Sequence, residues 1–334
     1  MAKKLRWGCL GAAQFALTKF LPAIPACRYA ELAAIASRDS AKAHKAAKKL
    51  GIPKAYGSYE ELLADPEIDV VYNPLPNHMH LEWSVRAAAA GKHVLCEKPI
   101  ALSVAEVDEM IAARDRYKVK IGEAFMVRTH PQWVRARELV RRGALGELRA
   151  VTGFFSYYNR DPNNIRNIPE AGGGALYDIG CYTIHLSRFL FGEEPVRVAA
   201  VLERDPEFGT DRLTSAVLEY PSGQCTWTVS TQLVPYQRMQ AFGTKARLEV
   251  EIPFNAPRDR PARIFIDQGG DLTGATIRTE EFPVCDQYTV EVDAFSKAVL
   301  EDREVPVPLE DSRANMAVIE AVFRAARSGQ WEPV

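Results

Sequence analysis

A chain of 334 residues exceeds the usual size of a single hydrophobic core, so its length predicts two domains. Its 42 basic and 43 acidic residues nearly cancel, and lysine and arginine are spread along the chain, which excludes the basic stripe of a typical nucleic-acid binder. Hydrophobic residues make up 47%, enough for a sizeable core, yet no run approaches the ~18 apolar residues of a membrane span.

The first 125 residues alternate between strand and helix patterns. Short apolar runs predict strands, at 5–10, 31–37, 69–72, 93–96 and 119–125. Helical patterns lie between them, from Gln14 to the prolines at 22 and 25, and at 41–50, 59–63, 80–90 and 104–117. This alternation predicts a parallel sheet built of βαβ units.

After residue 125 the pattern changes. Alternating apolar and polar residues predict strands, at 149–158, 196–202, 214–220, 224–231 and 246–252. Helices are predicted at 131–142, 175–191, 290–300 and 312–328. Strands of this kind are typical of a largely antiparallel sheet, so the chain is predicted to be α/β with two different sheets.

The six cysteines occur singly and form no CxxC pair. Several of them lie in apolar runs, where a cysteine behaves as a small hydrophobe. This usage fits a reducing compartment better than a disulfide framework. The N-terminus carries Lys3 and Lys4 but lacks the apolar region of a signal peptide, so we expect a cytoplasmic protein.

The turn after the first predicted strand is a candidate phosphate-binding loop. The G-x-G-x-x-G fingerprint brings amides at a helix N-terminus to the pyrophosphate of a dinucleotide. Here Ala13 and Ala16 replace the second and third glycines, and alanine lacks the freedom of glycine at positive φ. A plain strand-to-helix turn would leave the same residues, but the context favours a cofactor. The residues that we expect to bind it are Gly11, Ala12, Ala13, Gln14 and Phe15.

The end of the second predicted strand bears on the choice of cofactor. NAD enzymes usually carry an acidic residue there for the ribose 2′-hydroxyl, but this chain has Ser37 and Arg38. A hydroxyl and a guanidinium suit a 2′-phosphate, so these two residues favour NADP over NAD. Asp39 follows directly, and an arginine on the surface after a strand needs no ligand, so the alternatives stay open.

Lys98 follows the fourth predicted strand, between Glu97 and Pro99. Ligands of doubly wound sheets bind at the carboxyl ends of the strands, so Lys98 is expected near the nicotinamide. A solvated loop would also accommodate a lysine between these neighbours.

A glycine run at 172–174 precedes a predicted helix and either approaches a ligand or caps that helix. Within the helix, Asp178 and Tyr182 are four residues apart and therefore share a face. A carboxylate beside a phenol can bind a polyol and move a proton, although an Asp that favours the helix dipole and a core Tyr would show the same spacing. His185 is predicted to be a core histidine. Some residues of 157–160 and 163–166 are expected to contact substrate, unless they form only a polar loop.

Along nearly its whole length the chain resembles the glucose–fructose oxidoreductase, inositol dehydrogenase and rhizopine catabolism (Gfo/Idh/MocA) family. The motifs that carry the resemblance are 8–13, 74–80, 90–99 and 172–182. It implies an N-terminal Rossmann dinucleotide-binding domain over 1–125 and a C-terminal α/β domain over 126–334. The second domain is expected to have a large open, mostly antiparallel sheet that commonly serves oligomer contacts, so we expect a homo-oligomer (a dimer or tetramer).

The resemblance also implies residue roles. The loop that begins at 74 lines the cofactor cleft, and the residues expected there and after the fourth strand are Pro74, Leu75, Asn77, His80, Glu97 and Lys98. His78 and His80 are otherwise interpreted as loop or helix-start residues, and no metal is expected. The residues expected to bind substrate are Lys98, Arg128, Asp178 and Tyr182.

Tyr182 stands where many members of the family have histidine. The departure is shared by the branch of glucose–fructose oxidoreductase, NADP-dependent xylose dehydrogenase and dimeric dihydrodiol dehydrogenase, in which the tyrosine is taken as proton donor and acceptor. An unperturbed tyrosine titrates near ~10, so the Lys98 cation is expected to favour the phenolate. Arg128 matches a branch motif that usually reads M-Y-R, although Val127 replaces its tyrosine.

The resemblance predicts an NADP-dependent oxidoreductase that moves hydride between C1 of a pyranose, such as glucose or xylose, and nicotinamide. The runner-up is an aldose–ketose oxidoreductase with tightly bound NADP, and dihydrodiol oxidation and ketosugar reduction stay open. Two other classes are a glycoside hydrolase that uses nicotinamide transiently and a cofactor-sensing regulator. Lys98, Asp178 and Tyr182 together argue against the regulator, since a sensor does not need all three.

Overall fold

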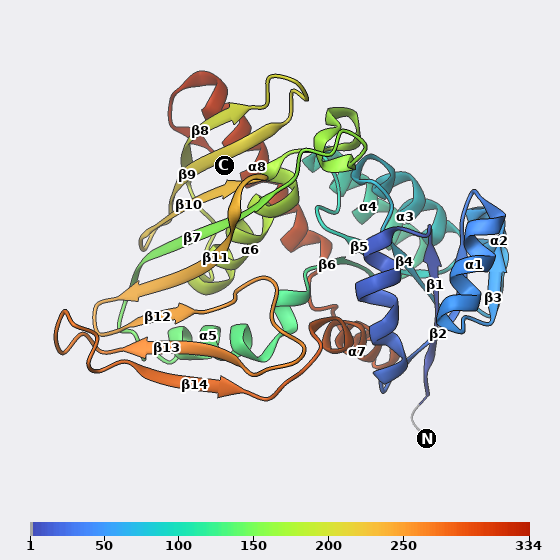
Figure 1. Cartoon of the computed structure of the whole chain (residues 1–334), viewed down its shortest axis with the longest axis horizontal. Helices are drawn as coiled ribbons and strands as arrows, with labels where there is room; N and C mark the ends of the chain where they lie inside the picture. The colour runs from blue at the N-terminus through green and yellow to red at the C-terminus, as the bar shows by residue number, and fades with distance from the viewer. Residues whose placement is uncertain (1–2) are drawn as a thin grey trace. The chain divides into compact units, whose positions relative to one another are not determined.

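The computed structural model describes residues 3–334 and divides them into two compact units (Figure 1). One unit comprises the chain up to Thr129 together with Asp286–Arg313. The other comprises His130–Cys285 together with Ala314–Val334. Among the described residues, no helix is both long and apolar enough to cross a membrane.

The first unit contains a six-stranded parallel sheet in the order β3-β2-β1-β4-β5-β6. Its strands are β1 (Leu5–Leu10), β2 (Ala30–Ala36), β3 (Lys54–Tyr56), β4 (Val70–Asn73), β5 (His93–Glu97) and β6 (Ile121–Ala124). This strand order is that of the dinucleotide-binding Rossmann fold, so the predicted fold of the N-terminal region is confirmed. The order changes direction between β1 and β4, and ligands of such sheets bind outside the carboxyl ends of the strands there.

Helices connect strands of this sheet, namely α1 (Ser40–Leu50), α2 (Tyr59–Ala64), α3 (His80–Ala89) and α4 (Val104–Tyr117). The unit also contains α7 (Gln287–Leu300), which follows β14 in the chain, and 3-10 turns at Asn77–Met79 and Met126–Thr129. The helix predicted from Gln14 is helical but irregular, with a π turn over Ala16–Phe20 and a 3-10 helix over Leu21–Ala26. Pro22 and Pro25 lie in the 3-10 part, and proline cannot donate the backbone hydrogen bonds of a regular α-helix.

The second unit contains a nine-stranded sheet in the order β14-β13-β12-β11-β7-β10-β9-β8-β15. Its strands are β7 (Leu148–Tyr158), β8 (Arg197–Arg204), β9 (Asp211–Glu219), β10 (Gln224–Ser230), β11 (Gln232–Gly243), β12 (Arg247–Val250), β13 (Ala262–Asp267), β14 (Arg278–Phe282) and β15 (Glu332–Pro333). All neighbouring pairs are antiparallel except β7 and β10, which are parallel. The predicted mostly antiparallel sheet is therefore confirmed, although β11, β13, β14 and β15 were not predicted.

The helices of this unit are α5 (Pro131–Arg141), α6 (Cys181–Phe191) and most of α8 (Leu309–Ser328), with 3-10 turns at Ile165–Asn167 and Pro169–Ala171. The helix predicted over 175–191 begins with a π turn at Leu176–Gly180 and becomes regular only at Cys181. Asp178 lies in the π turn and Tyr182 in α6.

The domain division differs from the predicted boundary at residue 125, because 286–313 belong to the first unit. Within that unit, Phe295 of α7 packs edge-on against Trp7, with ring centroids 5.7 Å apart. The indole of Trp7 also donates a hydrogen bond to the Ser296 hydroxyl at 3.1 Å. The predicted second domain over 126–334 is therefore interrupted. Local sequence does not show this interruption, because it depends on contacts such as that between Trp7 and Ser296, which are 289 residues apart in the chain.

Candidate active site

The turn after β1 keeps the one glycine that its geometry requires. Gly11 has φ +85°, and a Cβ there would lie 3.0 Å from the Leu75 side chain. Lys118 and Asp302 are the only non-glycine residues with positive φ in the described chain, so Ala13 and Ala16 occupy ordinary backbone conformations. The alanines at these positions therefore introduce no backbone strain.

Ser37 and Arg38, which were predicted to bind the ribose 2′-phosphate, directly follow β2. Arg38 is exposed, and its guanidinium lies beside Tyr59, opposing the increase in the Tyr59 pKa that burial causes. The Tyr59 hydroxyl is 3.6 Å from the position that a Cβ on Gly11 would occupy. Asp39 instead caps α1, where its carboxylate accepts a hydrogen bond from the Lys42 amide at 3.2 Å.

His80 joins two of the predicted cofactor segments. Its ring is completely buried, with Nε2 at 2.7 Å from the Leu75 carbonyl and Nδ1 at 2.8 Å from the Pro99 carbonyl. Burial lowers the pKa of His80 to about 4, so the ring is neutral near pH 7 and donates to one of these two carbonyls. His80 therefore holds the loop that starts at Pro74 against the segment that follows Lys98, rather than lining an open surface.

Sequence reasoning missed Asn73, the buried residue at the end of β4. Its side-chain amide donates to the His80 carbonyl at 3.3 Å and to Ser84 at 3.1 Å, and its oxygen accepts from the Leu75 amide at 3.3 Å. Asn73 thus organises the start of the cofactor loop. Only its place directly after an apolar strand and before a proline indicated such a role.

Glu97 and Arg128 are two other predicted site residues of this unit. Glu97 has a phenol as partner, and Arg128 has a carboxylate. The Tyr72 hydroxyl donates to Glu97 at 2.6 Å, and burial raises the Tyr72 pKa well above its usual value, so this phenol remains a donor. Arg128 lies 3.9 Å from the Asp311 carboxylate. Lys98 is half-buried directly after Glu97, at the carboxyl end of β5.

In the second unit, Asp178 is the centre of a polar cluster. Its Oδ2 accepts a hydrogen bond from the Tyr157 hydroxyl at 2.6 Å and lies 2.9 Å from Nε of Arg166. Burial and the nearby Asp178 carboxylate raise the pKa of Tyr157, so Tyr157 stays protonated and serves as a donor. The cluster therefore fixes one carboxylate oxygen with a neutral phenol and a cation.

The glycine run packs against protein atoms rather than leaving an open approach for a ligand. A Cβ on Gly173 would lie 2.6 Å from the Arg166 carbonyl oxygen. Gly174 has φ +120°, its amide donates to the same carbonyl at 2.9 Å, and a Cβ there would lie 2.0 Å from Oδ1 of Asp211. These two glycines are needed because Arg166 and Asp211 come this close.

Asp211, at the start of β9, anchors the turn that carries Asp178. Its carboxylate accepts hydrogen bonds from the Leu176 amide at 2.7 Å and the Thr214 hydroxyl at 3.0 Å. Burial raises the pKa of Asp211 to about 6. Nothing in the local sequence around Asp211 predicted this role, since the partner turn is 35 residues earlier in the chain.

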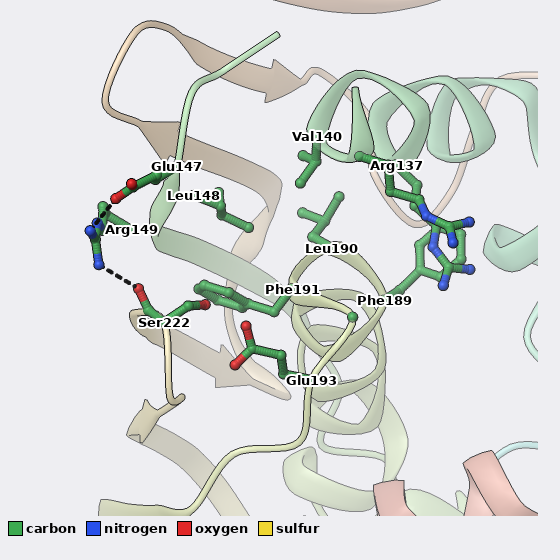
Figure 2. A pocket seen from close by; sticks show the side chains of 12 residues that line it. Arg137, Val140, Glu147, Leu148, Arg149, Phe189, Leu190, Phe191, Glu193 and Ser222 are labelled. Carbon is green, nitrogen blue, oxygen red and sulfur yellow. Dashed lines mark hydrogen bonds and ion pairs between the residues drawn. The ribbon is translucent and has the colours of Figure 1, made fainter. Parts of the chain in front are cut away.

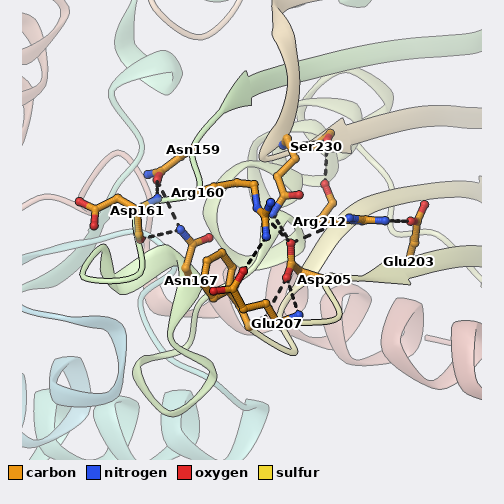
Figure 3. Close-up of polar contacts among 11 residues, drawn as sticks. Asn159, Arg160, Asp161, Asn167, Glu203, Asp205, Glu207, Arg212 and Ser230 are labelled. Carbon is orange, nitrogen blue, oxygen red and sulfur yellow. Dashed lines mark hydrogen bonds and ion pairs between the residues drawn. The ribbon is translucent and has the colours of Figure 1, made fainter.

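The loop that carries Arg166 is anchored by a second buried carboxylate, Asp205 (Figure 3). Asp205 accepts hydrogen bonds from the Gln232 side chain at 2.7 Å and from the Glu207 and Phe208 amides, and Arg160 lies 3.7 Å away. Farther along the loop, the Asn167 amide donates to the Asp161 carbonyl at 2.8 Å.

Tyr182 is buried between aromatic rings, with its ring centroid 6.1 Å from that of Phe155 and 5.6 Å from that of Phe254. The Asp178 carboxylate raises the pKa of the Arg166 guanidinium, and a negative charge on Tyr182 would raise it to a smaller extent. Asp178 and Tyr182 therefore lie within electrostatic range of one cation. His185, in contrast, is buried and stacks on Phe189, as expected of a core histidine.

A separate pocket of about 480 Å³ in this unit contains none of the predicted residues (Figure 2). It lies between α5, the end of α6 and β7, and two of its arginines already have partners. Arg149 bonds to Glu147 and to the Ser222 carbonyl, and the Arg137 guanidinium lies 4.2 Å from the centre of the Phe189 ring. This pocket is therefore not the candidate site.

The fold and these residues define a class: an oxidoreductase with a Rossmann domain for a nicotinamide dinucleotide and a second domain with a mixed sheet. Residues 5–125 match the oxidoreductase family with an NAD-binding Rossmann fold. Residues 133–249 match the GFO/IDH/MocA C-terminal domain. The chain belongs to the Gfo/Idh/MocA family of NAD(P)-dependent oxidoreductases.

Individual relatives match over nearly the full chain. An uncharacterized oxidoreductase of Rhizobium meliloti is 46% identical over 99% of both chains. The D-xylose 1-dehydrogenase (NADP(+)) 2 of Haloferax volcanii is 40% identical over 97% of this chain and 98% of its own. The crystal structure of aldose-aldose oxidoreductase from Caulobacter crescentus, complexed with glycerol, superposes with a TM-score of 0.91 at 30% identity over 99% of this chain and 100% of its own.

Proposed function

We propose that the protein is an NADP-dependent aldose 1-dehydrogenase, which oxidises a pyranose such as xylose or glucose at C1. The observation that carries this proposal is the Asp178 cluster, in which the fixed carboxylate and the candidate base Tyr182 both act electrostatically on the Arg166 guanidinium. The 40% identity to an NADP-dependent xylose dehydrogenase supports the choice of substrate class.

The preference for NADP rests on Ser37, Arg38 and Asp39. The exposed Arg38 guanidinium and the Ser37 hydroxyl suit a 2′-phosphate, while the Asp39 carboxylate is engaged at the start of α1. A carboxylate turned to a helix N-terminus is not available to bind the 2′-hydroxyl of NAD or to repel a phosphate. The strand end therefore supports NADP over NAD.

In the proposed reaction, Tyr182 takes the proton of the sugar C1 hydroxyl, and Asp178 orients the sugar through its hydroxyl groups. Lys98 binds the reacting hydroxyl and favours its ionisation through its positive charge. When bound, the nicotinamide supplies the acceptor for the hydride that leaves C1. Tyr157 does not act as base, because it stays protonated beside Asp178.

Two variants test the assignment of the acid and base groups. Lys98→Ala and Tyr182→Phe should each lower kcat by ~10²–10⁴-fold, the usual contribution of a positioned proton-transfer group. Both should still bind NADP, which fluorescence titration measures. Lys48→Ala, on the exposed face of α1, and Tyr117→Phe, at the end of α4, are matched controls that should keep wild-type rates. Full activity in either test variant would remove that residue from the mechanism.

The similarity to an aldose-aldose oxidoreductase favours one alternative, in which NADP stays bound and hydride passes from one sugar to another. The same residues would serve both reactions, so the two differ in whether the cofactor exchanges with solvent. Equilibrium dialysis of the purified protein distinguishes them. Cofactor that is lost on dialysis supports the dehydrogenase, and cofactor that is retained supports the sugar-to-sugar reaction.

We also propose that the protein forms a homo-oligomer through the nine-stranded sheet. Helices α5 and α6 pack on this sheet, yet large apolar side chains remain exposed elsewhere on its strands, with 76% of Val201 and 77% of Val234 accessible. Analytical ultracentrifugation should give a dimer or tetramer, and Val201→Glu should shift the equilibrium toward the monomer.

We also propose a cytoplasmic location. All six cysteines carry thiols rather than disulfides, which supports it.

A further inference from the structure

One peptide group next to Lys98 has both of its polar atoms bound by buried side chains. The carbonyl of Pro99 lies 2.8 Å from Nδ1 of His80. The amide of Ile100 donates a hydrogen bond to Oε1 of Glu123 at 3.0 Å. These two atoms belong to the same peptide bond, and a planar peptide moves as one body. The two contacts therefore fix the backbone directly after Lys98.

Glu123 reaches this peptide from β6, where the residue is only 4% exposed. Its own amide donates to the Val307 carbonyl at 3.2 Å. The neighbouring Gly122 lies so close to the same segment that a Cβ there would be 3.2 Å from the Val307 oxygen. The chain around Val307 therefore packs directly on β6 and holds the backbone of Glu123, which makes its side chain a fixed acceptor.

A small internal cavity of the first unit is lined by Glu123 and by Glu291 of α7. The space open to the centre of a water molecule is about 10 Å³, close to the minimum that one water needs. Much of the remaining wall is apolar, with Leu95, Phe125 and Phe295 among its residues. A buried water is held only where polar groups line the cavity, and two carboxyl groups meet this condition.

Glu291 shows that the cavity needs an occupant. Its side chain is 4% exposed, and within residues 3–334 its Oε1 has no hydrogen-bond partner. Burial, together with the nearby Glu97 carboxylate, raises the Glu291 pKa well above its usual value. Glu291 thus keeps its proton to higher pH than an exposed glutamate and carries a hydroxyl donor. A buried donor without an acceptor destabilises a fold, and a water in the cavity supplies the acceptor.

We propose that the cavity binds one water molecule, which accepts from Glu291 and donates to Glu123, and that this chain of hydrogen bonds positions Lys98 through the Ile100 amide. Glu123 and Glu291 are then positioning residues, since both act on Lys98 through other groups. The inference rests on the proposed role of Lys98 in the reaction. It deepens that role by assigning the placement of the ammonium to a buried network that runs through β6 to α7.

A high-resolution crystal structure tests the water site itself. In the wild type we expect one ordered water within hydrogen-bond distance of both Glu291 and Glu123. Glu291→Leu should lose this water, because leucine offers no donor. An empty cavity in the wild type, or a direct hydrogen bond between the two carboxyl groups, would contradict the proposed site.

Chemical labelling tests the positioning of Lys98 without any sugar. Acetic anhydride acetylates lysine amines, and peptide mass spectrometry gives the rate for Lys98 relative to the exposed Lys48. Glu123→Leu removes the acceptor for the Ile100 amide, so the half-buried Lys98 should gain freedom and react several-fold faster. Glu123→Gln keeps an Oε1 acceptor and should stay near the wild-type rate.

Glu291 provides a second pair of variants that leaves the contact between Glu123 and Ile100 in place. Glu291→Leu should raise the Lys98 rate by less than Glu123→Leu does, because only the support behind Glu123 is lost. Glu291→Gln keeps a donor for the water and should not change the rate. An unchanged rate in Glu291→Leu would contradict a role for the water in positioning, even where Glu123→Leu does not fold.

Glu61→Leu is the matched control. Glu61 also accepts a backbone amide, that of Gly57 at 2.9 Å, but it lies exposed on α2 of the same unit. Its Lys98 rate should equal that of the wild type. Near-ultraviolet circular dichroism checks that each variant is folded. An unchanged Lys98 rate in folded Glu123→Leu, or an equal increase in Glu123→Gln, would overturn the proposal.

Kinetics separate this inference from the proposed function. With an aldose as substrate, Glu123→Leu should lower kcat by up to ~100-fold, as a small misplacement of a reacting group can do, and leave the dissociation constant of NADP unchanged. Glu123→Gln should regain most of the loss. A parallel loss of NADP affinity would indicate general damage to the unit and contradict the inference. Absence of aldose oxidation by the wild type would reject the proposed substrate, while the labelling would still decide how Lys98 is positioned.

Discussion

The residues predicted to bind cofactor in the first unit (the cofactor half) and those predicted to bind substrate in the second unit (the substrate half) are built in different ways. The cofactor half consists of a backbone turn at Gly11 and of residues directly at strand ends, such as Arg38 and Lys98. The substrate half consists of side chains from distant segments, since Tyr157, Arg166 and Asp178 come from a strand, a loop and a π turn. The first half depends on local backbone geometry, and the second on buried charges that hold one another.

This difference predicts where each half is fragile. A backbone turn tolerates changes that keep its φ angles, as Ala13 and Ala16 show in place of glycine. A buried cluster fails when one member is displaced, because the remaining charges lose their compensation. The predictions below test this contrast, beginning with the largest expected effect.

Gly174→Ala should destabilise the second unit by roughly 3 kcal/mol or more, because the new Cβ combines a strained backbone with a collision. Gly174 has φ +120° and Asp211 lies 2.0 Å from the Cβ position. Gly192→Ala is the matched control, since Gly192 has φ +70° and nothing within 4 Å. It should lose only about 1 kcal/mol, the usual penalty for alanine in the left-handed region.

Urea unfolding, followed by tryptophan fluorescence, measures both free energies of unfolding. If both variants lost the same free energy of unfolding, Asp211 would move away from the new Cβ without a measurable destabilisation. The close approach of Asp211 would then not explain the glycine.

The contributions of the buried carboxyl groups of Asp211 and Asp205 to the free energy of unfolding should change with pH in opposite directions. Burial raises the Asp211 pKa to about 6, so its favourable contribution is present below pH ~4 and is lost as pH rises toward 6, a change of about 3 kcal/mol. The Asp205 pKa is lowered because hydrogen bonds from Gln232 and two amides outweigh burial. Its contribution is therefore present at neutral pH and is lost as pH falls below ~4.

Asp211→Asn should consequently destabilise the protein less at pH 7 than at pH 4.5. Asp205→Asn should destabilise it more at pH 7 than at pH ~3, because the Asp205 contribution is lost only below pH ~4. Chemical unfolding at each pair of pH values gives the four free energies. The same sign of pH dependence in both variants would contradict the assignment of these two carboxylates.

Arg38→Ala, in the cofactor half, should have the smallest and most selective effect. It should weaken NADP binding about tenfold, which corresponds to ~1.4 kcal/mol, and leave NAD binding nearly unchanged. Arg116→Ala, on helix α4 of the same unit, should alter neither. Fluorescence titration with each cofactor provides the dissociation constants, and equal losses for NADP and NAD would reject a phosphate contact by Arg38.

The same contrast explains how much the sequence could predict. Gly11, Arg38 and Lys98 stand at the ends of apolar runs, so local patterns were enough to locate them on the parallel sheet. The roles of Arg166 and Asp211 depend on contacts with a turn elsewhere in the chain, which no local pattern contains. The glycine run was recognised, but whether it faced a ligand or the protein required the positions of the Arg166 carbonyl and Asp211.

Local sequence patterns were also insufficient to predict parts of the second sheet. Strand β11 begins with a run of exposed residues that includes the apolar Leu233 and Val234, and it contains Pro235, so its alternation of apolar and polar residues is weak. The parallel pairing of β7 with β10 is equally hidden, because it depends on register between segments more than 60 residues apart.

The most direct test of the central claim is to follow reduced nicotinamide by its near-ultraviolet absorbance after the purified protein is mixed with xylose or glucose. The proposed dehydrogenase predicts no signal until free NADP is added, followed by continuous turnover that Tyr182→Phe abolishes. A stoichiometric signal without added cofactor, reversed by a second sugar, would instead establish sugar-to-sugar transfer. No signal with either sugar under either condition would contradict the aldose assignment, while the fold and family would stand.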